Sequence, residues 1–157
     1  LKACSLVEKS PELSHFVCDT SGSICELVNP SDKNDLLLTS ISRNFLIVCL
    51  EAPDSIYQVL IDRFLAKPKP MYYEENFLNS LWHSFKSGSS NTDDKINPDD
   101  FMVFGFKALI ERRKAIFDRI SKNWGITLNF ELLRRINDAT DLIEAIKLKI
   151  ESAIENP

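Results

Sequence analysis

Histidine and cysteine are the side chains of this chain that could bind a metal ion or act as nucleophiles. The sequence contains two histidines, His15 and His83, and four cysteines. His15 and Cys18 lie three residues apart. A structural zinc site, however, needs four ligands and is usually marked by two closely spaced cysteines, a pattern that this chain lacks. A Cys–His enzyme needs an oriented base, and His83, which follows Trp82, is typical of a surface or interface residue. We therefore predict no metal site and no catalytic residue.

Carboxylates are numerous, but their spacing is typical of a solvated surface. Residues 91–97 alternate like a calcium-binding loop, yet Lys95 would repel the ion, and the glycine and glutamate that such a loop needs are missing. Glu131 and Arg135 stand four residues apart, which is the spacing of an exposed ion pair on a helix. Only Glu12 is followed three residues later by a histidine, His15, whereas a two-metal bundle site needs this motif on each of two helices, and no glycine-rich phosphate loop is present. These patterns predict no cofactor.

Aromatic and basic side chains are the features that favour binding to another protein. Residues 71–85 contain more large aromatic residues than one buried helix face requires, and such residues are enriched in the cores of protein interfaces. A basic strip within residues 107–122 could contact phosphate, an anionic lipid surface or an acidic protein. The predicted partner-binding residues are Tyr72, Tyr73, Phe77, Trp82, Arg112, Arg119 and Lys122.

Composition limits the class of protein. The 157 residues are 44% hydrophobic and 27% charged, which is typical of a globular domain and not of a disordered chain. A net charge of -4 makes nucleic acid an unlikely partner, because DNA binding normally needs a basic face. The longest apolar run, residues 45–50, is far shorter than the roughly 20 residues that span a bilayer. We therefore predict no membrane-spanning segment.

Cysteine usage indicates the cellular compartment. The chain carries Cys4, Cys18, Cys25 and Cys49, all within its first third and without a spacing that demands disulfides. We therefore expect free thiols and an intracellular, cytoplasmic protein. The even number leaves an alternative open, namely two disulfides in a secreted helical protein.

Helix-start and helix-stop signals recur along the chain, and only four glycines are present, which favours an all-α fold. Within residues 32–51, the run at 45–50 could form a buried strand, but the spacing of Leu37, Ile41 and Phe45 favours a helix. Residues 88–97 are polar and predict a mobile loop. The predicted helices cover residues 11–20, a turn at 24–28, and about 32–51, 56–64, 73–86, 98–123 and 129–155.

The two C-terminal helices carry the clearest signals. Asn97 and Pro98, followed by two acids, form the strongest helix start in the chain. Residues 132–153 repeat apolar side chains at alternating spacings of four and three, as a heptad seam does. We therefore predict that these helices pair antiparallel as a long hairpin. Arg113 falls near the apolar seam, where we expect it to snorkel or to pair with an acid.

These observations predict one helical domain over residues 1–157. It would be an irregular bundle of five to seven helices in which residues 88–97 separate a short-helix N-terminal part from the long C-terminal hairpin. Two other folds remain open: a fragment of an α-solenoid, and an α+β fold with a β-hairpin at residues 15–28.

The function predicted from the sequence is a protein–protein interaction or regulatory module, such as an adaptor, without catalytic activity. Its partner would be another protein, or a second copy bound through the C-terminal hairpin. The alternative is a sensor domain that binds a small molecule in an apolar cavity, which Phe45, Phe64 and Trp82 would line.

Overall fold

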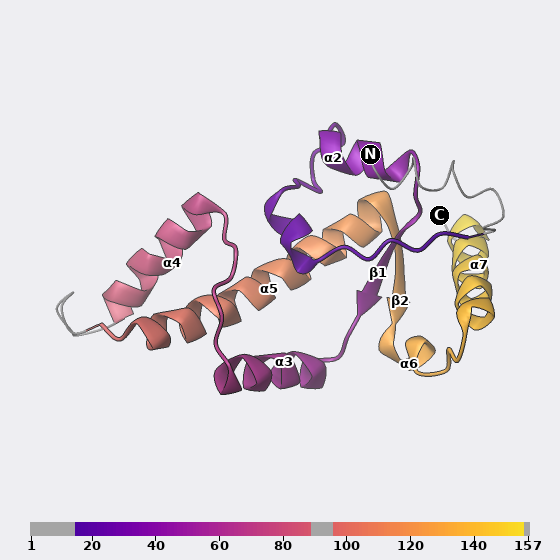
Figure 1. Ribbon diagram of the computed structural model, residues 1–157. Coiled ribbons are helices and arrows are strands. Elements are labelled where there is room, and N and C mark those ends of the chain that lie inside the picture. Colours follow the sequence, from indigo (N-terminus) through magenta and orange to yellow (C-terminus); the bar gives the residue numbers. More distant parts are fainter. Residues whose placement is uncertain (1–14, 89–95, 156–157) are drawn as a thin grey trace.

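The computed structural model describes residues 15–88 and 96–155, and helices dominate it (Figure 1). These stretches contain one 3-10 helix, six α-helices and two short strands. The helix-rich class predicted from the sequence is confirmed, although the strands mean that the fold is not purely α-helical. In chain order the elements are η1 (Gly22–Glu26), α2 (Leu36–Ser42), β1 (Ile47–Glu51), α3 (Asp54–Ala66), α4 (Glu75–Gly88), α5 (Pro98–Trp124), β2 (Gly125–Asn129), α6 (Phe130–Leu133) and α7 (Ala139–Glu155).

The apolar run at residues 45–50 leads into a strand and does not continue a helix. α2 ends at Ser42, and β1 then pairs in parallel with β2, so that Ile47 lies opposite Gly125. A run that is apolar on every side suits a strand of a parallel sheet, since such sheets are normally covered on both faces. The helix predicted over residues 32–51 is therefore wrong beyond Ser42. The strand partner lies far away in the sequence and leaves no local signal.

The strongest predicted helix start is confirmed. The Asn97 side chain accepts a hydrogen bond from the N–H of Asp99 and so caps α5, and Pro98 occupies its first turn. α5 continues for 27 residues to Trp124, and the next residue, Gly125, already belongs to β2. A Cβ atom at Gly125 would collide with the backbone oxygen of Ile47, so the close approach of the two strands requires glycine here.

The long antiparallel C-terminal hairpin predicted from the sequence is not found, because residues 129–155 do not form one helix. α6 stops after a single turn. A new helix, α7, starts where the Asp138 side chain accepts hydrogen bonds from the N–H groups of Thr140 and Asp141. The main contacts of α7 are with β2 and not with α5. The apolar residues of α7 thus pack the helix against a strand and not against a second helix, and Ala145 is the buried residue of α7.

In the N-terminal part, η1 overlaps the turn predicted at residues 24–28, but neither the helix over residues 15–20 nor the alternative β-hairpin is found. Residues 15–20 have no regular structure, and Ser21 caps η1 by accepting a hydrogen bond from the N–H of Ser23, so no β-hairpin forms. The helix predicted over residues 11–20 is likewise not found at 15–20. Residues 11–14 of that helix, and residues 89–95 of the predicted loop, lie outside the described residues.

The core lies along α5, against which α3 and α4 pack as amphipathic helices. Phe64 of α3 stacks on Phe106 of α5, with ring centroids 4.0 Å apart. Leu38, Leu109 and Leu128 are fully buried. Figure 1 shows α4 and the first half of α5 extending away from the strands, while α7 stands at the opposite end. No helix in the described part of the chain is long and apolar enough to cross a membrane.

Candidate protein-interaction site

Of the aromatic residues predicted to bind a partner, Tyr72 is exposed to solvent, and the other three lie where α4 contacts α5. Tyr72 lies in the extended segment before α4 and is 58% exposed. Tyr73 turns inward, and a Cβ atom added to Gly105 of α5 would come within 3.0 Å of its hydroxyl oxygen. Burial raises the pKa of Tyr73. The Phe77 ring lies beneath the guanidinium of Arg112, 4.4 Å from the ring centroid. Of these residues, Tyr72 is the one that solvent reaches freely.

Trp82 belongs to an aromatic cluster that joins α4 to the first turns of α5. Its ring meets Phe101 edge-on, with centroids 5.0 Å apart. Phe85 contacts both Phe101 and Phe104, at 5.4 Å and 5.3 Å. The Lys86 amino group lies 5.7 Å from the centroid of the Trp82 ring. These residues are half-buried, so their first role is to hold α4 on α5.

The basic strip predicted on α5 is largely neutralised by acids, most of them from other elements. Arg112, Lys114 and Lys122 each form an exposed or half-exposed ion pair with an acid. Such pairs contribute little stability individually, but they remove net positive charge from the strip. Arg119 is exposed and forms no ion pair with another described residue. The pairs are Arg112 with Glu74 (3.7 Å), Lys114 with Asp54 (2.9 Å) and Lys122 with Asp118 (2.9 Å).

Glu74 both binds Arg112 and caps α4. Its carboxylate accepts hydrogen bonds from the N–H groups of Asn76 and Phe77, at 2.8 Å and 3.0 Å. These bonds, followed by the charge of Arg112, lower the pKa of Glu74. Glu74 was not among the predicted site residues, although an acid in front of an apolar helical stripe is a recognisable start signal.

A buried ion pair joins η1 to α5. Arg113 donates a hydrogen bond from Nε to Oε1 of Glu26 at 3.0 Å, and the two side chains are 16% and 0% exposed. The expectation that Arg113 pairs with an acid is confirmed, but its partner was not identified. The only signal for Glu26 was its place inside the apolar segment 24–28. A Cβ atom at Gly22 would lie 2.9 Å from Nη1 of Arg113, so glycine makes room for the arginine.

Cys25 is buried near this ion pair, and Cys49 is half-buried. Burial, with a further contribution from Glu26, raises the pKa of Cys25 to about 12, and burial alone raises that of Cys49 to about 11. The thiolate is the nucleophilic form, so neither side chain is activated for catalysis at neutral pH. Cys18, Cys25 and Cys49 are free, as expected, and Cys4 lies outside the described residues. No cluster of metal-ligating side chains occurs in residues 15–88 and 96–155.

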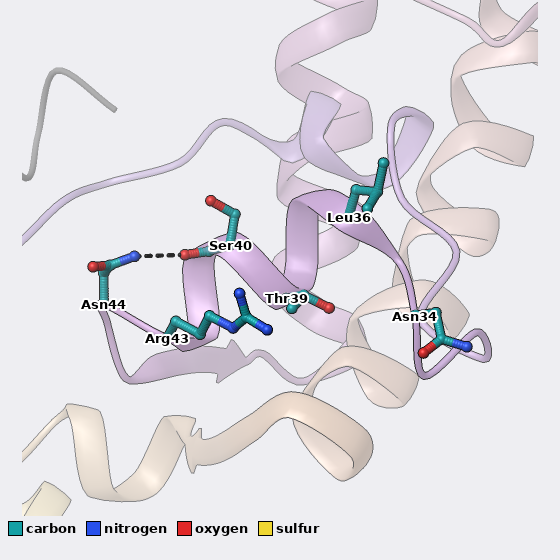
Figure 2. A pocket seen from close by; sticks show the side chains of 6 residues that line it. All are labelled: Asn34, Leu36, Thr39, Ser40, Arg43 and Asn44. Carbon is teal, nitrogen blue, oxygen red and sulfur yellow. Dashed lines mark hydrogen bonds between the residues drawn. The ribbon is translucent and has the colours of Figure 1, made fainter.

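Figure 2 shows a hollow on the surface of α2. Polar and apolar atoms contribute about equally to its wall, where the Asn44 side-chain amide donates a hydrogen bond to the backbone oxygen of Ser40. The hollow is lined by Asn34, Leu36, Thr39, Ser40, Arg43 and Asn44.

The residues expected to line an apolar cavity do not meet in one place. They belong to three different aromatic contacts: Phe45 with Phe16, Phe64 with Phe106, and Trp82 with Phe101. Each of the three rings packs against a different aromatic partner, and the three do not line a common cavity.

Large hydrophobic side chains are exposed across most elements of the described chain. A single exposed leucine is ordinary in a soluble protein. Here, however, twelve large hydrophobic residues are exposed, whereas nine hydrophobic residues are buried. The exposed residues are Val17, Leu27, Leu36, Leu46, Leu50, Val59, Leu60, Leu65, Tyr72, Leu78, Leu148 and Ile154.

Comparison with known proteins identifies no relative: neither the family models, nor the curated proteins, nor the solved structures match this chain. The proposed function therefore rests on the exposure and contacts of the chain's own residues.

Proposed function

We propose that the chain is a protein-interaction module without catalytic activity, which binds another polypeptide through exposed apolar side chains. The observation that carries this proposal is the excess of exposed over buried hydrophobic residues. Burying one large apolar side chain contributes about 1.5–3 kcal/mol. A partner that covers several of them therefore gains enough free energy to offset the entropy lost on association.

The contact that we propose centres on Tyr72, in the extended segment between α3 and α4. Tyrosine combines a large apolar ring with a polar hydroxyl and is frequent among residues that dominate binding energy. Arg119, which is exposed and forms no ion pair with another described residue, would add positive charge on α5, whereas Lys122 is paired with Asp118. Tyr73, Phe77, Trp82 and Arg112 would act indirectly, because their contacts hold α4 against α5 and so fix the segment that carries Tyr72.

The partner we propose is another protein in the cytoplasm. The free thiols of Cys18, Cys25 and Cys49 support a reducing compartment. A net charge of -4 and the neutralised basic strip both weigh against nucleic acid. Self-association through a C-terminal hairpin has no structural support, since α7 packs on β2.

Affinity capture with matched variants tests this proposal. Tyr72→Ser removes the exposed ring, and Leu148→Ser removes a similarly exposed side chain, 60% against 58%, from α7. A protein bound by the parent chain should bind Leu148→Ser equally and Tyr72→Ser about tenfold more weakly, which corresponds to about 1.4 kcal/mol. Equal capture by both variants would show that Tyr72 is not part of the contact.

A further inference from the structure

Residues 67–72 form a short extended segment between α3 and α4 that contains Pro68 and Pro70. Figure 1 shows the chain running past α5 between these two helices. Within the described residues, the backbone of residues 68–73 forms no hydrogen bond with other backbone groups. Proline fixes its own φ angle, lacks an N–H group and restricts the preceding residue to extended conformations. The sequence thus holds the segment extended, and its carbonyl groups are free to accept hydrogen bonds from a partner.

Both ends of this segment are anchored on neighbouring residues of α5. Shortly before it, the Phe64 ring stacks on Phe106, with centroids 4.0 Å apart. Directly after it, the Tyr73 hydroxyl lies so close to Gly105 that an added Cβ atom there would come within 3.0 Å of it. A segment that is held at both ends loses little conformational freedom on binding, and such preorganisation favours affinity.

Positive charge without a counterion surrounds the segment. Residues 63–72 contain three basic side chains and no acidic one, whereas the whole chain has a net charge of -4. The acids on either side are already engaged, because Asp62 accepts a hydrogen bond from Gln58 and Glu74 binds Arg112. An acidic partner would therefore meet charges that the described part of the chain does not neutralise. The three basic residues, all exposed and without an ion pair to another described residue, are Arg63, Lys67 and Lys69.

The exposed rings of the segment indicate the kind of surface that fits it. Pro68, Pro70 and Tyr72 are all exposed. Extended segments that contain proline bind in grooves lined by aromatic side chains, and they bind with little loss of entropy because they are extended beforehand. An aromatic-lined groove with an acidic rim would match both the rings and the charges.

Two other kinds of partner fit the segment less well. Neither proline can donate a backbone hydrogen bond, which disfavours pairing of the segment with the edge of a sheet. An anionic lipid surface is usually recognised by a cluster of roughly four to eight lysine or arginine residues. Residues 63–72 contain three. The rings and the small number of charges together favour a protein groove.

We propose that residues 67–72 are a proline-containing ligand that binds in an aromatic-lined, acidic-rimmed groove of a second protein. Pro68, Pro70 and Tyr72 would pack against the aromatic floor of the groove, while the three basic side chains would pair with acids at its rim. This inference rests on the protein-interaction function proposed above and names the chemistry of the partner at the Tyr72 contact.

Binding to a panel of SH3 and WW domains tests the proposal, because both kinds of domain carry aromatic-lined grooves for extended proline-containing segments. The panel combines domains with acidic groove rims and domains with basic ones. We expect the full chain to bind acidic-rimmed domains saturably in fluorescence anisotropy and to leave the basic-rimmed domains unbound. Added salt should weaken the binding, since salt screens exposed charges.

Two double variants separate the contribution of the rings from that of the charges. Pro68→Ala/Pro70→Ala removes both proline rings and keeps every charge. Lys67→Ala/Lys69→Ala removes two charges and keeps the rings. Each should bind the acidic-rimmed domains about tenfold more weakly than the parent chain does. In the lysine variant, the remaining binding should also depend less on salt.

α7 supplies the matched control. Lys147→Ala/Lys149→Ala removes two exposed lysines at the same spacing from a different part of the chain. This variant should bind the domains as tightly as the parent. The melting temperatures of all three double variants should stay close to that of the parent chain, because every substituted side chain is exposed.

Four results would overturn the proposal. Failure of every acidic-rimmed domain to bind the parent chain would exclude this kind of groove without relying on any variant. Parent-like binding by the proline variant would exclude recognition of the rings, and parent-like binding by the lysine variant would exclude the acidic rim. Binding to vesicles of phosphatidylcholine and phosphatidylserine, without binding to the domains, would assign the charges to a lipid surface.

The failure of this inference differs from a failure of the proposed function. A captured protein that binds Tyr72→Ser weakly, but both the proline variant and the lysine variant as tightly as the parent, would leave the Tyr72 contact in place and exclude only the groove. A captured protein that binds Tyr72→Ser normally would contradict the Tyr72 contact itself.

Discussion

Among single residues, Glu26 and Arg113 form the contact whose loss has the largest expected effect. The Glu26 side chain is fully buried, and its second oxygen, Oε2, accepts no hydrogen bond within the described residues. A buried charge that loses its partner costs more than the pair contributes when intact, because the remaining ion keeps its desolvation penalty. The pair thus holds η1 against α5, and replacing only one of its two residues would leave the other buried without its partner.

We predict that Arg113→Ala lowers the free energy of unfolding by about 3–5 kcal/mol, because it leaves the Glu26 carboxylate buried without a counterion. Urea denaturation measures the change. Lys122→Ala is the control, since it breaks an exposed pair with Asp118 that contributes about 0.5 kcal/mol or less. Similar small losses in both variants would contradict the role given to the buried pair.

The raised pKa values of Cys25 and Cys49 predict that stability depends on pH on the alkaline side. Cys25 and Cys49 have folded-state pKa values of about 12 and about 11, above the ordinary value of 9.0. Above pH 9 the unfolded chain loses these protons more readily than the folded chain does. The free energy of unfolding should therefore fall between pH 9 and pH 11, by up to about 1.4 kcal/mol per pH unit for each thiol.

Denaturation at several pH values checks this prediction. The double variant Cys25→Ala/Cys49→Ala should be less stable at neutral pH but should show a flatter alkaline slope. An unchanged slope in that variant would mean that other groups control the alkaline loss of stability.

The chemistry of individual residues was only partly predictable from the sequence. Free cysteines and an acid for Arg113 were expected, because both follow from local composition. The partner Glu26, which lies 87 residues away, could not be predicted, since the pairing depends on where η1 meets α5. For the same reason, three residues selected as surface contacts, Tyr73, Phe77 and Trp82, prove to be half-buried in the contact of α4 with α5.

At the scale of elements, Gly125 determines how α5 meets the sheet. Its lack of a side chain lets β2 start directly after Trp124 and approach Ile47 of β1. The backbone oxygen of Ile47 cannot move aside as the end of a long side chain can, so position 125 does not readily accept a residue larger than glycine.

We predict that Gly125→Ala lowers the melting temperature clearly, because the new Cβ atom would collide with the backbone oxygen of Ile47 and separate the strands. The loss in the free energy of unfolding should lie in the range of about 1–3 kcal/mol that is typical of overpacking. Gly88→Ala is the matched control: no heavy atom lies within 4 Å of its added Cβ, and alanine is the better helix former. Thermal unfolding followed by circular dichroism compares the two, and equal melting temperatures would contradict the tight approach.

Helices with local signals were predictable, and elements that depend on distant partners were not. α3, α4 and α5 follow from caps, prolines and apolar spacing inside their own segments. β1 is apolar without alternation and pairs with a strand that lies far away in the sequence, while β2 alternates apolar and polar residues over only four positions, Ile126 to Asn129. The break between α6 and α7 was indicated by Asn137 and Asp138, but the heptad spacing across it concealed the signal.

At the scale of the whole molecule, the elements differ in how many neighbours support them. α5 contacts η1, α3, α4 and both strands, whereas the main contact of α4 is with α5. Leu81 is the buried residue of α4, while α5 buries five. Stability is therefore expected to be uneven, with α4 opening locally before the centre of the molecule unfolds.

We predict that the backbone amides of α4 exchange with deuterium at least about tenfold faster than those in the middle of α5. Hydrogen exchange followed by mass spectrometry measures both segments in one experiment. Trp82→Ala should accelerate exchange in α4 further and leave β1 unchanged, since the Trp82 contact with Phe101 joins only these two helices. Equal protection of α4 and α5 would show that they unfold as one unit.

Because Trp124 is followed directly by Gly125, the direction of α5 is fixed at the point where the helix joins the sheet. No residue separates the end of the helix from the start of the strand, so a change in the direction of β2 at Gly125 changes the direction of α5. The 27 residues of α5 span about 40 Å, and a rotation of about 5° at Gly125 displaces the Pro98 end by about 3.5 Å. A change in the twist of the two strands would thus displace the Pro98 end of α5 more than any other part of the helix. Two distant surfaces of this chain are mechanically connected through one helix.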